Sequence, residues 1–419
     1  MIKQIIKEVL KVAGILLAGV LIGFLALCFV HLLPVDRMYE NVQSSKDAIN
    51  AYGNIVNGYV STSMDNYTDC IMINEAICPI EAPLIDKAIN NYHVNYWKGY
   101  EQPENLLRYL DGEQGYKYQG YSHYWGGHQV VLKLLLLAFD YSDILVMNII
   151  LQSMLIVFII IGLQRSKKEF VIIPFCIAVL TMMPSAIAVC LQFSTVFYTT
   201  LFGILFIVWR YPYLKKENQC YIFLLIGMAT SYFDFLTYPF VSLGLPLVVS
   251  IAYMAEDKLG RQIRNVVINS ALWGIGYLGM WSGKWILGSI LSPESGSLKV
   301  ALKSIAYRGS AVAQGQVLSV FDVFLENAFI YLRKPTMILI FGAAVFFIIR
   351  ILARRYRVNC FLRAIPYLIV CFYPIAWYRV ARNHSFEHAF MAYRVLAITI
   401  FAGLCMLSNL ASKEEKTSE

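Results

Sequence analysis

Long apolar segments recur along this chain between residues 12 and 407, and short basic clusters follow many of them. A helix of about 20 apolar residues matches the thickness of a bilayer core, because an α-helix rises about 1.5 Å per residue. The composition agrees, with 58% apolar residues, only 15% charged residues and a mean hydropathy of +0.58. The sequence therefore predicts an all-α polytopic membrane protein.

Ten segments have the length and composition expected of membrane-spanning helices. They are 12–33, 144–163, 170–190, 191–209, 221–236, 240–255, 266–290, 336–349, 362–377 and 390–407. A tight turn near Pro184 is expected to join the third and fourth of these segments. A shorter apolar stretch, 129–139, is predicted to lie at the membrane interface, because counting it as a span would invert every later basic loop. With ten spans, both termini are predicted to be cytoplasmic. Either Ser142 or Asp143 is expected as the N-cap of the second span.

The predicted organisation follows from these spans. Residues 1–33 form an N-terminal anchor helix, 34–128 a large extracytoplasmic loop, 129–408 a helical bundle and 409–419 a cytoplasmic tail, with a second outward loop at 291–334. The net charge of +8 arises from basic residues between apolar segments, as membrane orientation requires, so the expected partners are membrane lipids and not nucleic acid.

The nine cysteines contain no CxxC pair, and no zinc site is expected. Two of them, Cys70 and Cys78, share the large loop. They could form a disulfide if that loop faces an oxidising space.

Acidic residues of the large loop are candidates for a catalytic base. Asp36 and Glu40 share one face of a predicted helix, and Asp65 and Asp69 have the same i, i+4 spacing. A carboxylate at the membrane boundary can accept the proton of an acceptor hydroxyl, and a pair of them could instead hold a divalent cation. The alternatives are a solvated acidic helix face for the first pair and a helix cap or polar turn for the second.

Cationic and aromatic residues gather at two outward places, and we expect them to bind an anionic group. They are His123 and His128 at the end of the large loop, and Arg379, Arg382, His384, His388 and Arg394 around the link before the last span. Outward basic residues run against the positive-inside rule, so a specific phosphate is a fitting explanation. The alternatives are an interfacial aromatic belt, and pairing with Glu387 and lipid headgroups.

Two further charges, Asp234 and Lys284, stand alone near the outward ends of apolar helices. They are expected to form a structural ion pair with each other, or Lys284 extends its amine toward the interface.

The first 170 residues or so resemble the GT-C superfamily of polyprenyl-phosphate-dependent glycosyltransferases. In that family an acid in the first outward loop follows the first span, and the loop ends in a basic or His residue that leads into an interfacial helix. Asp36-Arg-Met-Tyr-Glu40 and His128 stand in these two places. No paired acid directly follows Asp36, and the prolines often found after the terminal residue of the loop are absent. The segment 383–394 is similar to uncharacterised membrane proteins of Gram-positive bacteria, which would fit the assembly of cell-surface polysaccharide.

This resemblance implies that a sugar moves from a polyprenyl phosphate to a cell-surface glycan, lipid or protein on the outward face. Asp36 would remove the proton of the acceptor hydroxyl, with Asp65 or Asp69 as alternatives. His128 and the Arg and His residues of the link would hold the leaving phosphate. A polysaccharide polymerase or ligase, and a non-enzymatic transporter of lipid-linked glycans, are the rival interpretations. A divalent cation is the only cofactor considered, and no dedicated metal site is predicted.

Overall fold

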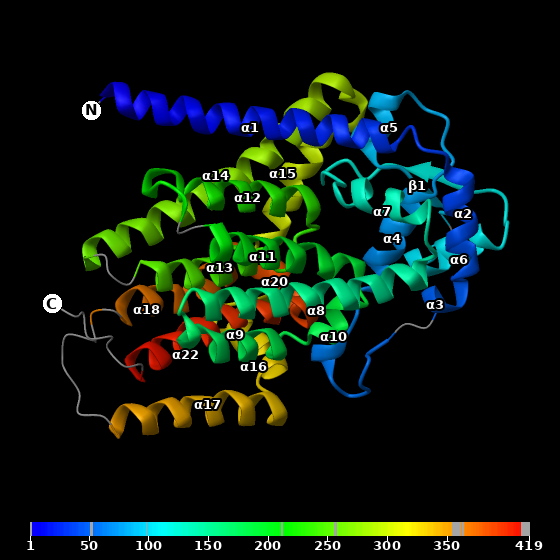
Figure 1. Ribbon diagram of the computed structural model, residues 1–419. Coiled ribbons are helices and arrows are strands. Elements are labelled where there is room, and N and C mark those ends of the chain that lie inside the picture. Colours follow the sequence, from blue (N-terminus) through cyan, green and yellow to red (C-terminus); the bar gives the residue numbers. More distant parts are fainter. Residues whose placement is uncertain are drawn as a thin grey trace.

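The structure is a computed structural model that describes residues 2–50, 53–97, 99–210, 213–254, 258–353, 362 and 364–411. Long helices lie side by side in a bundle, and the polar segment between α1 and α7 covers one end of it, which we call the polar end (Figure 1). Helix α1 begins, and α22 ends, at the opposite end of the bundle (Figure 1). The described chain is therefore all-α in class.

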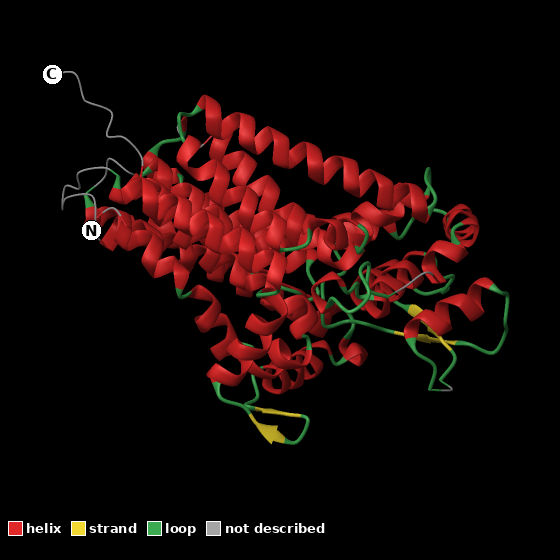
Figure 2. Cartoon of the chain, turned by 90° about the horizontal axis from the view of Figure 1, so that it is seen from below, coloured by secondary structure: helices red, strands yellow, loops and turns green. Residues whose placement is uncertain are grey.

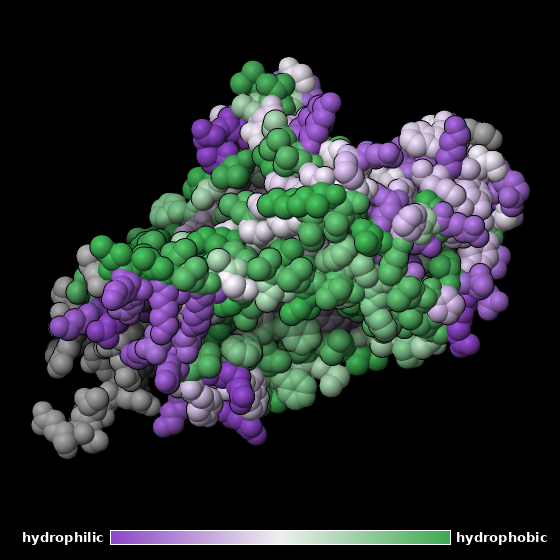
Figure 3. Space-filling view, turned by 90° about the horizontal axis from the view of Figure 1, so that it is seen from above, coloured by the Kyte–Doolittle hydropathy of each residue, from purple (hydrophilic) through white to green (hydrophobic). Residues whose placement is uncertain are grey.

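Five helical stretches of the described chain are long and apolar enough to cross a membrane. They are α1 (Ile2–Val30), α8 (Tyr141–Arg165), α11 (Leu191–Arg210), α17 (Lys334–Leu352) and the stretch Ala389–Ala411, which contains α21 (Ala389–Ala392), η7 (Tyr393–Leu396) and α22 (Ala397–Ala411). Hydrophobic side chains form a broad band between hydrophilic ends of the molecule (Figure 3). These features indicate a membrane protein.

The remaining helices of the bundle are shorter or less uniformly apolar. They are α9 (Ile172–Thr181), α10 (Pro184–Ala188), α12 (Tyr221–Phe233), α13 (Phe240–Tyr253), α14 (Leu259–Leu291), α18 (Ile365–Cys371) and α19 (Tyr373–Val380), with short 3₁₀ turns η2 (Glu169–Val171) and η4 (Lys216–Asn218). The backbones of α12 and α14 approach closely at Gly227 and Gly276. A Cβ atom on Gly227 would lie 2.1 Å from the carbonyl oxygen of Trp273, so only glycine permits this packing.

The turn predicted near Pro184 is present, but it interrupts the segment 170–190, so that segment is not one continuous span. Helix α9 ends at Thr181, Met183 adopts a left-handed backbone with φ of 59°, and Pro184 begins the short helix α10. Proline has no N–H to donate and disfavours helical geometry in the residue before it, so the chain breaks where Pro184 stands. The segment 362–377 is likewise divided, because Pro374 lies in the first turn of α19.

The predicted N-cap of α8 is also wrong by two or three residues. Asp140 has extended backbone angles, and its side chain accepts a 2.8 Å hydrogen bond from the backbone N–H of Asp143. Asp143 therefore supplies the capped N–H and is not the cap itself. The helix consequently begins at Tyr141.

The polar segment contains short helices and one small sheet. These are α2 (Val35–Ser44), α3 (Lys46–Asn50), η1 (Val60–Thr62), α4 (Asn66–Ala76), α5 (Leu84–Asn90) and α6 (Gln102–Leu110), with strands β1 (His93–Asn95) and β2 (Lys117–Gln119) paired antiparallel. The segment leads into α7 (His128–Leu136), a nine-residue helix in the place where a short interfacial helix is predicted. Cys70 and Cys78 are free thiols, so the disulfide considered between them is not formed.

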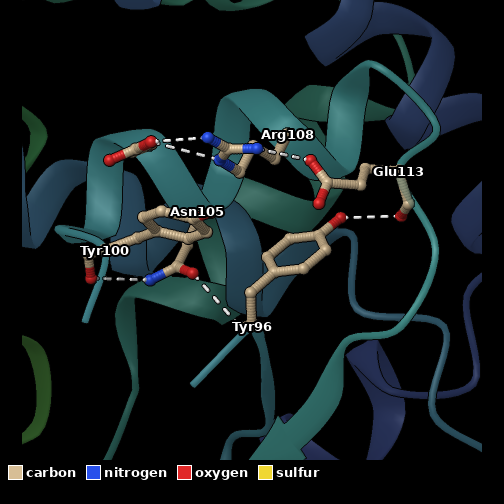
Figure 4. A network of polar contacts seen from close by, with 6 residues as sticks. Tyr96, Tyr100, Asn105, Arg108 and Glu113 are labelled. Atoms are coloured by element: carbon tan, nitrogen blue, oxygen red, sulfur yellow. Dashed lines mark hydrogen bonds and ion pairs between the residues drawn. The ribbon is translucent and has the colours of Figure 1, made fainter. Parts of the chain in front are cut away.

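Side-chain contacts hold the outer part of this segment in one conformation (Figure 4). Arg108 forms ion pairs with Glu104 and Glu113 at 2.9 and 2.7 Å, and its guanidinium lies 4.0 Å from the centre of the Tyr100 ring. The buried Asn105 accepts from the backbone N–H of Tyr96 at 3.1 Å. The segment is thus an ordered domain and not a loose loop.

Residues 291–334 also fold into regular structure. They form η5 (Pro293–Ser295), α15 (Ser297–Arg308), a hairpin of β3 (Val312–Ala313) and β4 (Gln316–Val317), and α16 (Val320–Tyr331). The hairpin projects from the side of the bundle, separate from the polar segment (Figure 2). Helix α20 (Arg382–Glu387) packs against both α15 and α16, which brings the link before the last helix next to this region.

Candidate functional site

Three polar stretches that are far apart in the sequence meet at the polar end of the bundle. The end of the polar segment contacts the end of α12, where the backbone N–H of Gly127 donates to the carbonyl of Tyr232 at 3.1 Å. Near the link, the hydroxyl of Tyr393 donates to the carbonyl of Ser61 at 2.7 Å. The large loop and the link before the last helix therefore lie at the same end.

A groove of about 900 Å³ runs between α7, α8, α11 and α12. Its lining is mostly apolar and includes Val131, Leu135, Met147, Leu151, Met154, Tyr198, Phe202, Phe206, Leu225 and Phe233, with Leu214, Asn218 and Tyr221 at one end and Met72 and His128 at the other. Leu151 and Phe202 are 44% and 50% exposed, so the groove opens on the outside of the bundle. Because it follows all 13 residues of α12, it is about 20 Å long.

A buried pair, Glu75 and His128, lies where this groove reaches the polar end. Glu75 on α4 is 2% exposed and His128 at the start of α7 is 4% exposed. The two side chains are 3.2 Å apart, from Oε2 of Glu75 to Nε2 of His128. Burial raises the pKa of Glu75, and the hydrogen bond with His128 opposes that rise. A carboxylate that holds an imidazole in this way can orient it for proton transfer.

Two neighbours on α7 complete the surroundings of the pair. The amide of Gln129 donates to Oε2 of Glu75 at 3.1 Å and to the carbonyl of Met72 at 2.8 Å. Lys133 is 2% exposed and donates to the carbonyl of Ala76 at 2.7 Å. Burial lowers the pKa of Lys133 to about 8, while the charge of Glu75 acts in the opposite direction. The site therefore balances one buried carboxylate against nearby positive charge.

Aromatic rings form a wall beside the pair. The ring of Phe235, in the turn after α12, lies 4.8 Å from that of His128 and 5.1 Å from that of Tyr124. The guanidinium of Arg308 lies 5.4 Å from the centre of the Tyr124 ring. His123 packs on Tyr124 at 4.4 Å, and burial together with the charge of Arg308 lowers the pKa of His123 to about 4. Through Phe235 and Tyr124, these contacts connect the His128 end of the groove with Arg308, which lines a second opening.

That second opening is a polar pocket of about 300 Å³, which we call the cationic pocket. Its lining residues come from α15 and from the link: Lys303, Ser304, Tyr307, Arg308, Asn383, His384 and His388. The rings of His384 and His388 are 4.8 Å apart. Two of the predicted phosphate-binding residues thus line a pocket with two cations that were not predicted.

Two of the predicted acids cap helices. Asp69 is fully buried and accepts 2.8 Å hydrogen bonds from the backbone N–H groups of Leu191 and Gln192, at the start of α11. Asp65 caps α4 by accepting from Thr68 at 3.1 Å. The capping alternative for this pair is therefore correct, and both carboxylates are engaged by protein groups.

The other two predicted acids lie on the surface. Asp36 and Glu40 are exposed residues of α2. Arg37 beside Asp36 donates to the carbonyl of Leu137 at 2.7 Å, just past the end of α7. Since α7 has nine residues, about 13 Å separates that end from His128. The structure does not bring Asp36 next to the Glu75 and His128 pair.

The predicted arginines are in three different environments. Arg379 is exposed at the end of α19. Arg382 donates to the carbonyl of Leu318 at 3.1 Å. Arg394 is fully buried, donates to the carbonyl of Met182 at 3.1 Å and stacks over Phe193 at 4.3 Å. None of the three lines the groove or the cationic pocket as the structure describes them.

The expected ion pair between Asp234 and Lys284 is wrong. Asp234 accepts from the N–H and hydroxyl of Thr237 within its own turn, at 3.0 and 2.7 Å. Lys284 donates to the carbonyls of Ala88 and Ile89 at 3.3 and 2.7 Å. Asp234 therefore stabilises its own turn, whereas Lys284 connects α14 to the backbone of α5.

The sequence interpretation missed Glu75, Lys303 and Arg308. Glu75 is a single acid in the apolar run Cys70–Ala76, and a lone charge in such a run is a signal for a buried functional group. Lys303 and Arg308 lie in the second predicted outward loop, where basic residues conflict with the positive-inside rule. The same conflict therefore marks Lys303 and Arg308 as candidates for anion binding.

No group of three or more His, Cys, Asp or Glu side chains that could hold a metal ion occurs among the described residues. Comparisons with protein-family models, curated proteins and solved structures gave no match.

Proposed function

We propose that the protein is a membrane glycosyltransferase that moves a sugar from a polyprenyl phosphate to a glycan, lipid or protein acceptor at the cell surface. In this proposal the chain crosses the membrane ten times, with both termini cytoplasmic and the polar end outward. Basic clusters such as 165–168 and 258–264, which lie between the apolar helices, support this orientation.

The observation that carries the proposal is the apolar groove that ends at the Glu75 and His128 pair. A groove about 20 Å long that opens on the outside of the bundle fits an isoprenoid chain. Among the described residues that line the groove, only His128 is paired with a buried charged side chain, that of Glu75. An apolar channel that leads to one polar centre suits a lipid whose reactive group is at its head.

In the proposed reaction, the acceptor oxygen forms a bond to C1 of the sugar while the bond from C1 to the phosphate oxygen breaks. His128 accepts the hydroxyl proton, and Glu75 orients the ring and stabilises the imidazolium. The Nε2 atom of His128 faces Glu75, so Nδ1 is the nitrogen that exchanges a proton with the substrate. This assignment replaces Asp36 as the base, because Asp36 lies near the far end of α7 from His128.

The test is transfer from a labelled polyprenyl-phosphate sugar by the full chain in proteoliposomes. We expect His128→Gln to lower the transfer rate roughly 100-fold or more, since a general base contributes about 10²–10⁴ in rate. Asp36→Asn is expected to stay within about threefold of the wild type. The opposite pattern, with Asp36 essential and His128 dispensable, would show that the acid-base assignment is wrong.

Blocking the groove tests the lipid assignment separately. Leu151→Trp places a large ring in the groove, whereas Val146→Trp adds the same ring on an exposed part of the same helix that is outside the lining. We expect only Leu151→Trp to raise the KM for the lipid donor. Movement of the lipid-linked sugar across the membrane without a covalent product would assign a transporter and contradict the proposal.

A further inference from the structure

The cationic pocket holds two cations, Lys303 and Arg308, for which the described part of the chain supplies no ion-paired carboxylate. The acid beside the pocket, Glu387, accepts hydrogen bonds from the hydroxyl of Tyr307 at 3.1 and 3.0 Å. Arg308 is half-buried, and a partly desolvated cation without a counter-charge is costly to maintain.

A buried imidazole in the same pocket also lacks partners. His384 is 2% exposed, and neither of its ring nitrogens makes a hydrogen bond within the described structure. Burial and the charge of Arg308 hold the pKa of His384 well below its usual value, although the nearby backbone of Leu236 and Thr237 acts in the opposite direction. The ring is therefore neutral and can offer one N–H donor. Buried polar atoms usually have partners, so the ring nitrogens of His384 are suited to bind a ligand that enters this pocket.

We propose that the cationic pocket binds the anionic group of the acceptor, a phosphate monoester or an oxyanion of similar charge. Arg308 offers a planar pair of donors, Lys303 a point charge, and His384 and His388 two more donors, which together match phosphate oxygens. This inference rests on the proposed function.

The position of the pocket assigns it to the acceptor and not to the donor. The donor chain occupies the groove, so its phosphate lies at the His128 end. The cationic pocket is lined by Arg308, which contacts the ring of Tyr124, and Tyr124 in turn contacts Phe235 beside His128. Two openings that meet at one aromatic wall allow two substrates to approach the same centre from different sides.

Binding of an anion is measured without any transfer reaction. The full chain in phosphatidylcholine nanodiscs is titrated with inorganic phosphate or sulfate at constant ionic strength, and the thermal midpoint is recorded. We expect a saturable rise in the midpoint. The Lys303→Gln, Arg308→Gln variant should weaken the apparent affinity roughly tenfold or more.

The matched control removes the same charge elsewhere. Lys299 on α15 and Arg333 before α17 are exposed and outside the pocket lining, so the Lys299→Gln, Arg333→Gln variant should bind phosphate as the wild type does. Equal weakening in both double variants would overturn the site, because only net charge would then matter. If the pocket variant does not fold, Lys303→Gln alone, at an exposed position, is compared with Lys299→Gln.

Two further measurements separate the source of the anion and the two proposals. Adding phosphatidylglycerol to the nanodisc should leave the phosphate-induced shift of the thermal midpoint unchanged. If the added lipid abolishes that shift, the pocket is a lipid-headgroup site and the acceptor assignment is overturned. In the transfer assay, Arg308→Gln should raise the KM for an anionic acceptor but not for the donor. Phosphate binding without any transfer would refute the proposed reaction and leave the anion site standing.

Discussion

Replacing Asp69 is the sharpest test of how the structure distributes roles among the acidic residues. Its buried carboxylate accepts two 2.8 Å hydrogen bonds from the first backbone N–H groups of α11. Asp69→Ala removes both acceptors and leaves two N–H groups unpaired away from water. Burial raises the pKa of Asp69 to about 7, so the group is ionised above that pH. Each hydrogen bond to a charged group contributes about 1.5–3 kcal/mol, so the expected loss of unfolding free energy at about pH 8 is about 3–6 kcal/mol.

The assay is equilibrium or thermal unfolding of the purified chain in detergent, followed by tryptophan fluorescence. Asp36→Asn is the control, because Asp36 is exposed and surface substitutions usually change stability by less than about 0.5 kcal/mol. If Asp69→Ala changes the free energy of unfolding by less than about 0.5 kcal/mol and also abolishes transfer activity, the capping role is refuted and Asp69 is again a candidate catalytic acid.

Two further outcomes are expected. His93 is 1% exposed, and burial lowers its pKa to about 4. Between pH 4 and 6.5 the unfolded chain therefore binds more protons than the folded chain, so the free energy of unfolding falls as the pH is lowered through this range. The wild type should lose about 2 kcal/mol of unfolding free energy between pH 8 and 5 because of His93, and His93→Phe should remove this part of the loss. Unfolding at both pH values measures it. Gly276→Ala places a methyl group 2.2 Å from the carbonyl oxygen of Leu224, whereas Gly274 on the same helix has open space. Gly276→Ala should destabilise the chain by at least about 2 kcal/mol in the same assay, and an equal effect of Gly274→Ala would disprove the close helix contact.

The helical elements were predicted well where a single physical signal controls them. Apolar length is enough to place α1, α8, α11 and α17, because the bilayer core sets the length of a crossing helix. For the segment 170–190, hydropathy alone placed the end of the span at residue 190, whereas α9 ends at Thr181, and only Pro184 indicated the turn. Hydropathy averages over a window and does not register one missing N–H group.

Only part of the candidate site could be predicted from the sequence. The sequence indicates that His128, His384 and His388 are unusual, since they flank apolar helices on the side predicted to be outward. It does not show that His128 pairs with Glu75, 53 residues earlier, or that His384 shares a pocket with Arg308. Such pairings depend on how helices pack, and residue type carries no information about them.

The sequence by itself determined that the protein has apolar helices suited to a membrane. It also determined which polar residues are available near the predicted outward boundary, including six histidines and a set of acids. Tertiary structure alone decided which acids serve the fold and which face a cavity. Asp69 is used as a cap because packing places the start of α11 against it, and Glu75 faces His128 because α4 packs on α7. The same carboxyl group becomes structural or functional according to whether a backbone N–H or a titratable side chain meets it.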